Sequence, residues 1–242
     1  MMPATDDGAS QARYSESATT TKLTVNLPPA DIRPLLQGAA VLPIMTVQDS
    51  ACAVPLARAL VAGGVRVFEI VLRTPAALRA IADIRRQVPE ATVGAGTLVT
   101  PDDVTRALDA GAQFGVTPGL TDELGQAARQ HRLPLLPGVW TAGEVMQALR
   151  LGFDTLKLFP AQGLQGAAQI EQLQPVFPQV RFCPTGGIKP EHIAPYLALK
   201  GCLAVGGSWV TPADRIAAGD WAAITTLARQ ATAFAQARAA AA

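Results

Sequence analysis

A single pattern repeats along the chain and limits the folds that it can adopt. From residue 41 onward, a short apolar run is followed by Gly or Pro and then by a stretch with the apolar spacing of a helix. Such runs predict buried strands, and the stretches between them predict amphipathic helices. Successive runs begin 19 to 26 residues apart, and they lie at 41–47, 67–73, 92–97, 114–119, 133–138, 155–160, 181–187 and 202–208.

Eight strands that alternate with helices favour an α/β fold of the closed parallel (β/α)8 barrel type, the TIM barrel. The alternative is an open doubly wound sheet, which usually has about five or six strands. That fold would be supported by a GxGxxG dinucleotide-binding motif. The only candidate begins at Gly94, has Val99 where the third glycine should stand, and is followed by no predicted helix before Pro101. We therefore expect a barrel.

The expected barrel is one domain that covers residues 29–238. Residues 1–28 are rich in Ser and Thr and are expected to form a flexible leader, and the alanine-rich residues 239–242 are expected to be a frayed tail. The leader lacks the apolar segment of a secretory signal peptide, so we expect a cytoplasmic location.

Composition narrows the class of partner. The chain has 49% hydrophobic and 16% charged residues and a net charge of +1, so it carries no basic field that would attract nucleic acid or an anionic membrane. Its apolar runs are also far shorter than the roughly 20 residues that span a bilayer. Three cysteines without a CxxC pair and two widely separated histidines predict neither a disulfide framework nor a metal site. A small molecule is the expected partner.

The predicted strand 67–73 carries two charged residues among apolar ones. Side chains alternate between the faces of a strand, so Glu69 and Arg73 share one face while Phe68 and Ile70 share the other. The apolar face packs against helices, which turns the charged face toward the barrel interior. One interpretation is an ion pair, although residues four apart on a strand are separated by roughly 13 Å. The other is a general acid/base at Glu69 and a carboxylate-binding fork at Arg73.

The predicted strand 155–160 places Lys157 on its interior face together with Phe159. Burial removes water from an ammonium group and so favours the neutral amine, which is the form that attacks a carbonyl carbon. One interpretation is therefore a lysine that forms a Schiff base with a ketone. The alternative is structural: the side chain reaches the rim of the barrel or neutralises a carboxylate such as Glu69.

Two glycine pairs close the last two apolar runs. In barrels of this type, the loops after strands seven and eight commonly bind phosphate, because glycines let backbone N–H groups approach the oxygens. A serine hydroxyl beside such a pair adds a further donor. Glycine pairs also serve as simple turns between a strand and a helix. The residues concerned are Thr185, Gly186 and Gly187 in the first loop and Gly206, Gly207 and Ser208 in the second.

Seven segments occur together in a specific order and spacing: LVAGGVRVFEIVLRT (60–74), VGAGT (93–97), FGVTPGL (114–120), LPLLPGV (133–139), KLFPA (157–161), VRFCPTGGI (180–188) and GGSWVTPAD (206–214). From about residue 35 to residue 230, the chain resembles the bacterial 2-keto-3-deoxy-6-phosphogluconate (KDPG) aldolase / 4-hydroxy-2-oxoglutarate (KHG) aldolase family. The resemblance implies a class I aldolase on a (β/α)8 barrel. It also implies a homotrimer that needs no metal or other cofactor, since a lysine forms the covalent imine.

The resemblance assigns roles to individual positions. It implies that Lys157 is the Schiff-base lysine and that Glu69 is the general acid/base. It further implies that Arg73 and Thr97 hold the pyruvyl carboxylate and that Pro118 and Phe159 line the pocket. The positions expected around the substrate hydroxyls and phosphate are Thr185, Gly186, Gly187, Gly207 and Ser208.

The activity implied by the resemblance is cleavage of KDPG to pyruvate and glyceraldehyde 3-phosphate in the Entner–Doudoroff pathway, with action on 4-hydroxy-2-oxoglutarate as well. One alternative is the same chemistry on the galactonate epimer. Another is a phosphate-binding barrel isomerase that uses Glu69 without a covalent step. A barrel without any catalytic activity would tolerate Glu69→Gln. The expected ligand is a small phosphorylated keto acid.

Overall fold

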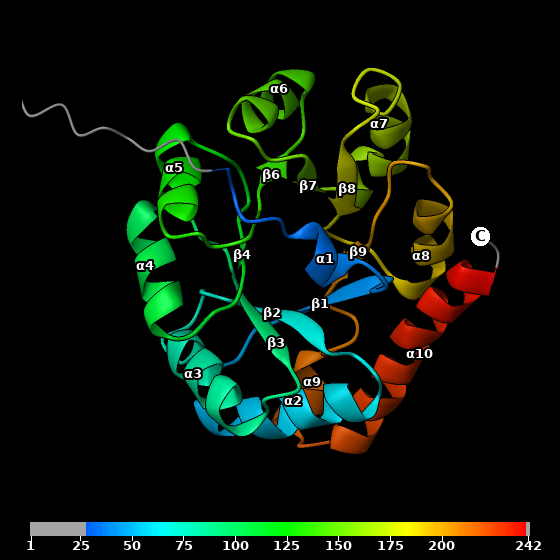
Figure 1. Ribbon diagram of the computed structural model, residues 1–242. Helices are drawn as coiled ribbons and strands as arrows, with labels where there is room; N and C mark the ends of the chain where they lie inside the picture. Colours follow the sequence, from blue (N-terminus) through cyan, green and yellow to red (C-terminus); the bar gives the residue numbers. More distant parts are fainter. Residues whose placement is uncertain (1–27, 241–242) are drawn as a thin grey trace, which may run out of the picture.

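Parallel strands form the centre of the molecule in the computed structural model, which describes residues 28–240 (Figure 1). The predicted leader falls almost entirely on residues outside this range, as do residues 241–242. The strands of the described chain are β1 (Val41–Met45), β2 (Val67–Val71), β3 (Thr92–Gly96), β4 (Gly115–Val116), β5 (Leu135–Leu136), β6 (Gly138–Val139), β7 (Thr155–Leu158), β8 (Arg181–Pro184) and β9 (Val205–Gly207).

The strands follow one another around a ring. One sheet has the order β5-β4-β3-β2-β1-β9 and the other has the order β6-β7-β8, and every pair is parallel. Two further parallel bridges, Phe182 with Cys202 and Thr185 with Gly206, connect β8 to the segment of β9. The contacts therefore return to their starting point, and the predicted (β/α)8 class is confirmed.

The predicted fifth strand, 133–138, is divided into β5 and β6 at Pro137. A proline has no N–H to donate to a neighbouring strand, so the ladder is interrupted there. The Gly138 amide instead donates to the Thr117 hydroxyl at 3.0 Å, while the Pro137 carbonyl accepts a hydrogen bond from the Lys157 amide at 2.8 Å. The two short strands thus occupy one position in the ring, and the second fixes the backbone at Lys157.

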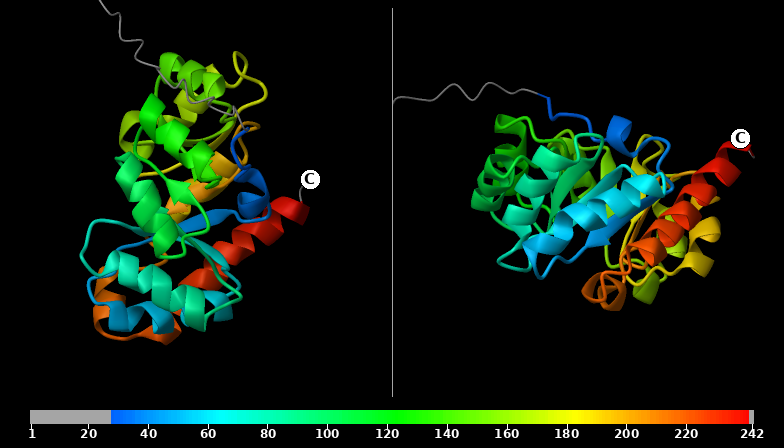
Figure 2. Two further views of the ribbon diagram at one scale, coloured as in Figure 1. Left: turned by 60° about the vertical axis from the view of Figure 1, so that its left-hand side comes forward. Right: turned by 90° about the horizontal axis from the view of Figure 1, so that it is seen from below.

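Helices surround the strands in both further views (Figure 2). Threonine hydroxyls accept hydrogen bonds from the first-turn amides of α4, α5 and α6, at Thr100, Thr121 and Thr141, as expected for N-caps. None of the helices within residues 28–240 is long and apolar enough to cross a membrane. The helices are α1 (Arg33–Leu36), α2 (Ala53–Ala62), α3 (Ala77–Gln87), α4 (Pro101–Asp109), α5 (Asp122–Gln130), α6 (Ala142–Arg150), α7 (Gly166–Leu173), α8 (Pro190–Leu197), α9 (Ala213–Ala217) and α10 (Trp221–Ala240), with 3-10 turns at Ser50–Cys52 and Gln162–Leu164.

Two apolar clusters fill the molecule. The larger lies between strands and helices and contains the outward-facing side chains, among them Phe68, Ile70, Leu156 and Leu158. The smaller lies inside the ring of strands and contains Ile32, Leu36, Leu42, Phe114, Val116, Leu136, Cys183 and Ala204. Ile32 and Leu36 come from the segment of α1, which covers the end at which the strands begin, whereas a cavity opens at the other end.

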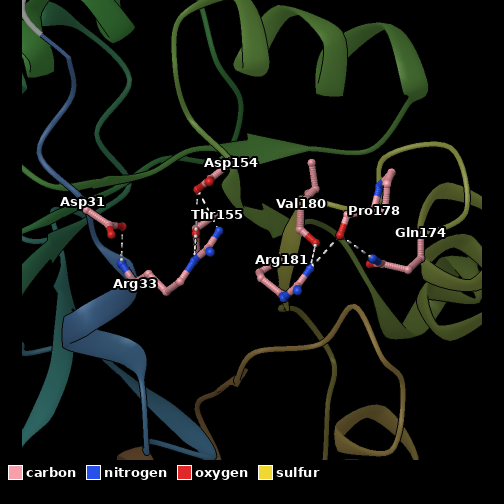
Figure 3. Close-up of polar contacts among 8 residues, drawn as sticks. All are labelled: Asp31, Arg33, Asp154, Thr155, Gln174, Pro178, Val180 and Arg181. Carbon is pink, nitrogen blue, oxygen red and sulfur yellow. Dashed lines mark hydrogen bonds and ion pairs between the residues drawn. The ribbon is translucent and has the colours of Figure 1, made fainter.

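The short helix α1 covers the amino-terminal end of the barrel. Its Arg33 forms an ion pair with Asp154 at 3.0 Å and donates from Nε to the Thr155 hydroxyl at 3.3 Å (Figure 3). Nearby, the Arg181 guanidinium donates to the Pro178 carbonyl at 2.9 Å. The contacts of Arg33 hold the helix under the strands, where Ile32 and Leu36 join the interior cluster.

Candidate active site

A cavity of about 240 Å³ opens at the carboxyl ends of the strands. Its wall combines the end of β1, the end of β2, the end of β7 and the loops after β8 and β9. This is the end of a barrel from which enzymes of this fold present their reacting groups. The lining residues are Ile44, Thr46, Glu69, Val71, Arg73, Lys157, Phe159, Thr185, Gly186, Gly187, Ile188, Gly206 and Ser208.

Glu69 is the most deeply buried charged side chain of the cavity wall, with 1% of its surface exposed. Within the described chain, its Oε2 has no hydrogen-bond partner and its carboxylate forms no ion pair with Arg73. Burial raises the pKa of Glu69 above its usual value of 4.5, against the opposing effect of the positive charges of Lys157 and Arg73. A carboxyl group in such a setting takes up a proton more readily than one in water, which suits proton transfer.

Lys157 lies in the same cavity and is also buried, with 6% of its surface exposed. Its Nζ stands 4.8 Å from the centre of the Phe159 ring. Across the part of the chain described by the structure, no carboxylate forms an ion pair with Lys157. The amine acts on Glu69 through its charge but forms no direct ion pair with it, so it is available to a ligand.

Arg73 and Thr97 come together at the mouth of the cavity. The Arg73 Nε donates to the Thr97 hydroxyl at 3.2 Å, although the two residues follow different strands. Thr97 adopts a left-handed backbone with φ of 63°, which is uncommon for a residue with a side chain. The contact leaves the terminal nitrogens of Arg73 as donors for a carboxylate.

The two glycine loops form a further part of the cavity wall. Gly186 and Gly187 have φ of 104° and 72°, a backbone conformation that residues with side chains rarely adopt. Thr185 is buried, and its hydroxyl donates to the Cys183 carbonyl at 3.2 Å. A Cβ added at Gly206 would collide with the Thr185 hydroxyl, so a glycine is required for β8 and β9 to approach this closely.

The predicted site residues divide into two groups. The cavity wall contains Glu69, Arg73, Lys157, Phe159, Thr185, Gly186, Gly187 and Ser208, whereas Thr97, Pro118 and Gly207 are absent from it. Thr97 contacts the wall through Arg73. Pro118 lies with its carbonyl against Gly138. Gly207 faces the Trp209 indole, and a Cβ added at Gly207 would collide with Trp209 Nε1 at 2.8 Å.

Some lining residues were not identified from the sequence. Ile44 and Thr46 lie on β1 and just after it, in a run that reads as an ordinary buried strand. Alternation could have found them, because Leu42 belongs to the interior cluster and residues 44 and 46 point the same way. The same alternation along β2 places Val71 on the face of Glu69 and Arg73. Ile188 and Gly206 are the remaining lining residues of the cavity.

Cys183 lies opposite Lys157 in the pairing of β7 with β8. Burial and, to a smaller extent, the nearby Glu69 carboxylate raise the pKa of this thiol to about 12, so it stays protonated and is a poor nucleophile. Among residues 28–240, no three His, Cys, Asp or Glu side chains gather in the way that a metal site requires. The amine, the carboxyl group and the guanidinium are the reactive groups of the cavity, and its two cations favour an anionic ligand.

A family model described as "Aldolase: KDPG and KHG aldolase" matches residues 32–227. The KHG/KDPG aldolase of Escherichia coli K12 is 48% identical over 197 residues, which are 81% of this chain and 92% of that relative. All of the segments that line the cavity lie inside the matched range.

Two solved structures extend the likeness to three dimensions. The 2-keto-3-deoxy-6-phosphogluconate aldolase of Zymomonas mobilis ZM4 with 3-phosphoglycerate has a TM-score of 0.80 and 48% identity, over 84% of this chain and 96% of that one. KDPG aldolase from Legionella pneumophila, with pyruvate captured at low pH as a covalent carbinolamine intermediate, has a TM-score of 0.80 and 38% identity, over 81% of this chain and 96% of that one.

Proposed function

The chain belongs to the KDPG and KHG aldolase family, and from that premise we propose that Lys157 is the amine on which its reaction takes place. The protein is a class I aldolase that cleaves KDPG to pyruvate and glyceraldehyde 3-phosphate, a step of the Entner–Doudoroff pathway. The observation that carries the assignment of Lys157 is its position. It is a buried lysine that forms no ion pair within residues 28–240, and it lies in one cavity with a buried carboxyl group.

The reaction begins when the neutral amine of Lys157 attacks the C2 ketone of the substrate. The resulting carbinolamine takes up a proton and loses water, which leaves an iminium ion, and the final hydrolysis releases that proton again. Its positive nitrogen accepts the electron pair of the C3–C4 bond, so the bond breaks and an enamine forms. The C4 hydroxyl loses its proton in the same step, and the C4 carbon leaves as the aldehyde of glyceraldehyde 3-phosphate.

Glu69 is the group that moves protons in this scheme. It accepts the proton of the C4 hydroxyl through a water molecule and returns a proton to C3 of the enamine. Hydrolysis of the iminium ion then releases pyruvate and restores the amine. The raised pKa of Glu69 supports this role, because the group must hold a proton between the two steps.

The remaining residues hold the two ends of the substrate. Arg73, oriented by its contact with Thr97, binds the pyruvyl carboxylate with its terminal nitrogens. The backbone amides of the loop at Gly186 and Gly187 and the hydroxyl of Ser208 bind the phosphate at the part of the wall that the two glycine loops form. Apart from water, the chain supplies every group that this scheme uses, and the scheme needs no cofactor.

The assignment is tested by measuring pyruvate release from KDPG with a coupled NADH assay. Lys157→Ala is expected to lower kcat by more than about 10³-fold, because it removes the covalent step. Lys200→Ala is the matched control, since Lys200 is an exposed lysine remote from the cavity lining, and it is expected to keep wild-type activity. Near-normal turnover by Lys157→Ala would refute the assignment.

We also propose that the enzyme works as a homotrimer in the cytoplasm. The family resemblance supports the trimer, and sedimentation at three times the 25.2 kDa chain mass is the expected result. The substrate supports the location, because a phosphorylated keto acid is multiply charged and does not cross a bilayer unaided. Cell fractionation is expected to recover the activity with cytoplasmic markers.

A further inference from the structure

Thr46 stands at the mouth of the cavity and has no role in the scheme above. Leu42, Ile44 and Thr46 alternate with outward-facing residues along β1 and its end, so all three point into the barrel. Leu42 belongs to the interior cluster, Ile44 is half-buried against the cavity, and Thr46 is exposed to it. The Thr46 side chain is therefore the uppermost group that β1 presents to a ligand.

The hydroxyl of Thr46 is not used by the fold. Two nearby threonines donate to the backbone of the β1 segment: Thr211 to the Ile44 carbonyl at 3.0 Å, and Thr74 to the Val47 carbonyl at 2.5 Å. Within residues 28–240, by contrast, no hydrogen bond of the Thr46 hydroxyl to the protein exists. The Thr46 hydroxyl, which can both donate and accept a hydrogen bond, therefore remains available to a ligand in the cavity.

Strand order places Thr46 between the two ends of the substrate. β1 pairs with β9 on one side, where Pro43 lies opposite Gly207, and with β2 on the other, where Ile44 lies opposite Glu69. Ser208 follows β9 and Arg73 follows β2. A substrate that extends from a phosphate near Ser208 to a carboxylate at Arg73 must pass in front of the end of β1.

We propose that the Thr46 hydroxyl forms a hydrogen bond with the C5 hydroxyl of the substrate, the group next to the phosphate-bearing carbon. This inference rests on the proposed function, which fixes the two ends of the ligand. Thr46 is then a specificity-determining residue: it selects phosphorylated aldehydes that carry a hydroxyl beside the carbonyl carbon. In the synthetic direction, that hydroxyl belongs to glyceraldehyde 3-phosphate, and the analogue without it is 3-oxopropyl phosphate.

The test compares these two aldehydes at saturating pyruvate for the wild type, Thr46→Val and Thr46→Ser. Valine keeps the shape of threonine and removes the hydroxyl, whereas serine keeps the hydroxyl. Loss of one neutral hydrogen bond is expected to lower kcat/KM for glyceraldehyde 3-phosphate by about 2- to 12-fold in Thr46→Val. The value for 3-oxopropyl phosphate is expected to stay within about twofold, and Thr46→Ser is expected to recover most of the loss.

Two outcomes overturn the inference: no loss with either aldehyde, or an equal loss with both. An equal loss would assign Thr46 to the shape of the cavity. The proposed function is tested separately in the same experiment, because wild-type protein must form carbon–carbon bonds from pyruvate and glyceraldehyde 3-phosphate. If the wild-type protein forms no product, the proposed function is refuted. If the wild type is active and Thr46→Val does not show the expected selective loss, only the inference about Thr46 is refuted.

Discussion

Gly96 gives the Glu69 carboxyl group the space it occupies, so Gly96→Ala tests the position of the proton-transferring residue. A Cβ added at Gly96 would lie 2.7 Å from Glu69 Oε2, 2.9 Å from Glu69 Cδ and 3.1 Å from Val71 Cγ1. Ordinary contacts between such atoms are about 3.5 to 4.0 Å. The carboxyl group must therefore move by roughly 0.5 to 1 Å. Gly96 has no positive φ, so alanine strains no backbone angle there.

The displacement is expected to affect proton transfer more than imine formation. A misplacement of about 1 Å at a reacting group can lower the rate by roughly 10²-fold. We therefore expect Gly96→Ala to slow the exchange of pyruvate methyl protons with D2O, measured by NMR, by about 10²-fold. Trapping of the pyruvate imine with borohydride is expected to remain, because Lys157 is not displaced.

Gly115→Ala is the matched control. A Cβ there would lie 2.7 Å from Leu98 Cδ1, 2.9 Å from Leu135 Cδ1 and 3.1 Å from Leu133 Cδ2, which is the same crowding without the carboxyl group. Both variants are expected to lose about 1 to 3 kcal/mol of unfolding free energy, the usual cost of overpacking. Equal slowing of proton exchange in both variants would refute the reasoning. The slower exchange would then result from crowding of the core in general and not from displacement of the Glu69 carboxyl group.

Two further predictions concern the pH dependence and the phosphate. The folded state binds the Glu69 proton more tightly than the unfolded state, so wild-type stability is expected to fall as pH rises above 4.5 by up to about 1.4 kcal/mol per pH unit, until the raised pKa is passed. Urea titrations of Glu69→Gln should show a stability advantage over wild type that grows with pH, and a constant difference would contradict this. Ser208→Ala is expected to lower kcat/KM for KDPG by about 10- to 150-fold. Activity on unphosphorylated 4-hydroxy-2-oxoglutarate should change little. Equal losses of kcat/KM for the two substrates would show that Ser208 does not bind the phosphate.

The repeat of apolar runs was sufficient to predict the barrel, because each run corresponds to one position in the ring. It did not predict the interruption at Pro137, since LPLLPG reads as one apolar run. Nor did it predict α1, which has only four residues and no periodicity to detect. That helix is held by Arg33 through contacts with Asp154 and Thr155, residues more than a hundred positions away in the chain.

Alternation along strands predicts the interior positions of Glu69 and Lys157, because each is a charged residue among apolar neighbours, and Phe159 shares the face of Lys157. Thr46 lies on the same face of the β1 segment as Leu42 and Ile44, but a threonine after an apolar run is not by itself a sign of a functional site. Loop residues were harder to place. Gly206 faces the cavity, while Gly207 follows it one position later and faces Trp209, a difference that a glycine pair does not reveal.

The central claim is that Lys157 forms the covalent bond to the substrate. The most direct measurement is peptide mass spectrometry of the protein after treatment with pyruvate and borohydride. The chain has four lysines, Lys22, Lys157, Lys189 and Lys200, which distinct proteolytic peptides separate. The account predicts an added mass of about 72 Da, the reduced pyruvate imine, on Lys157 and on no other lysine. An adduct on a different lysine, or the same adduct in Lys157→Ala, would contradict it.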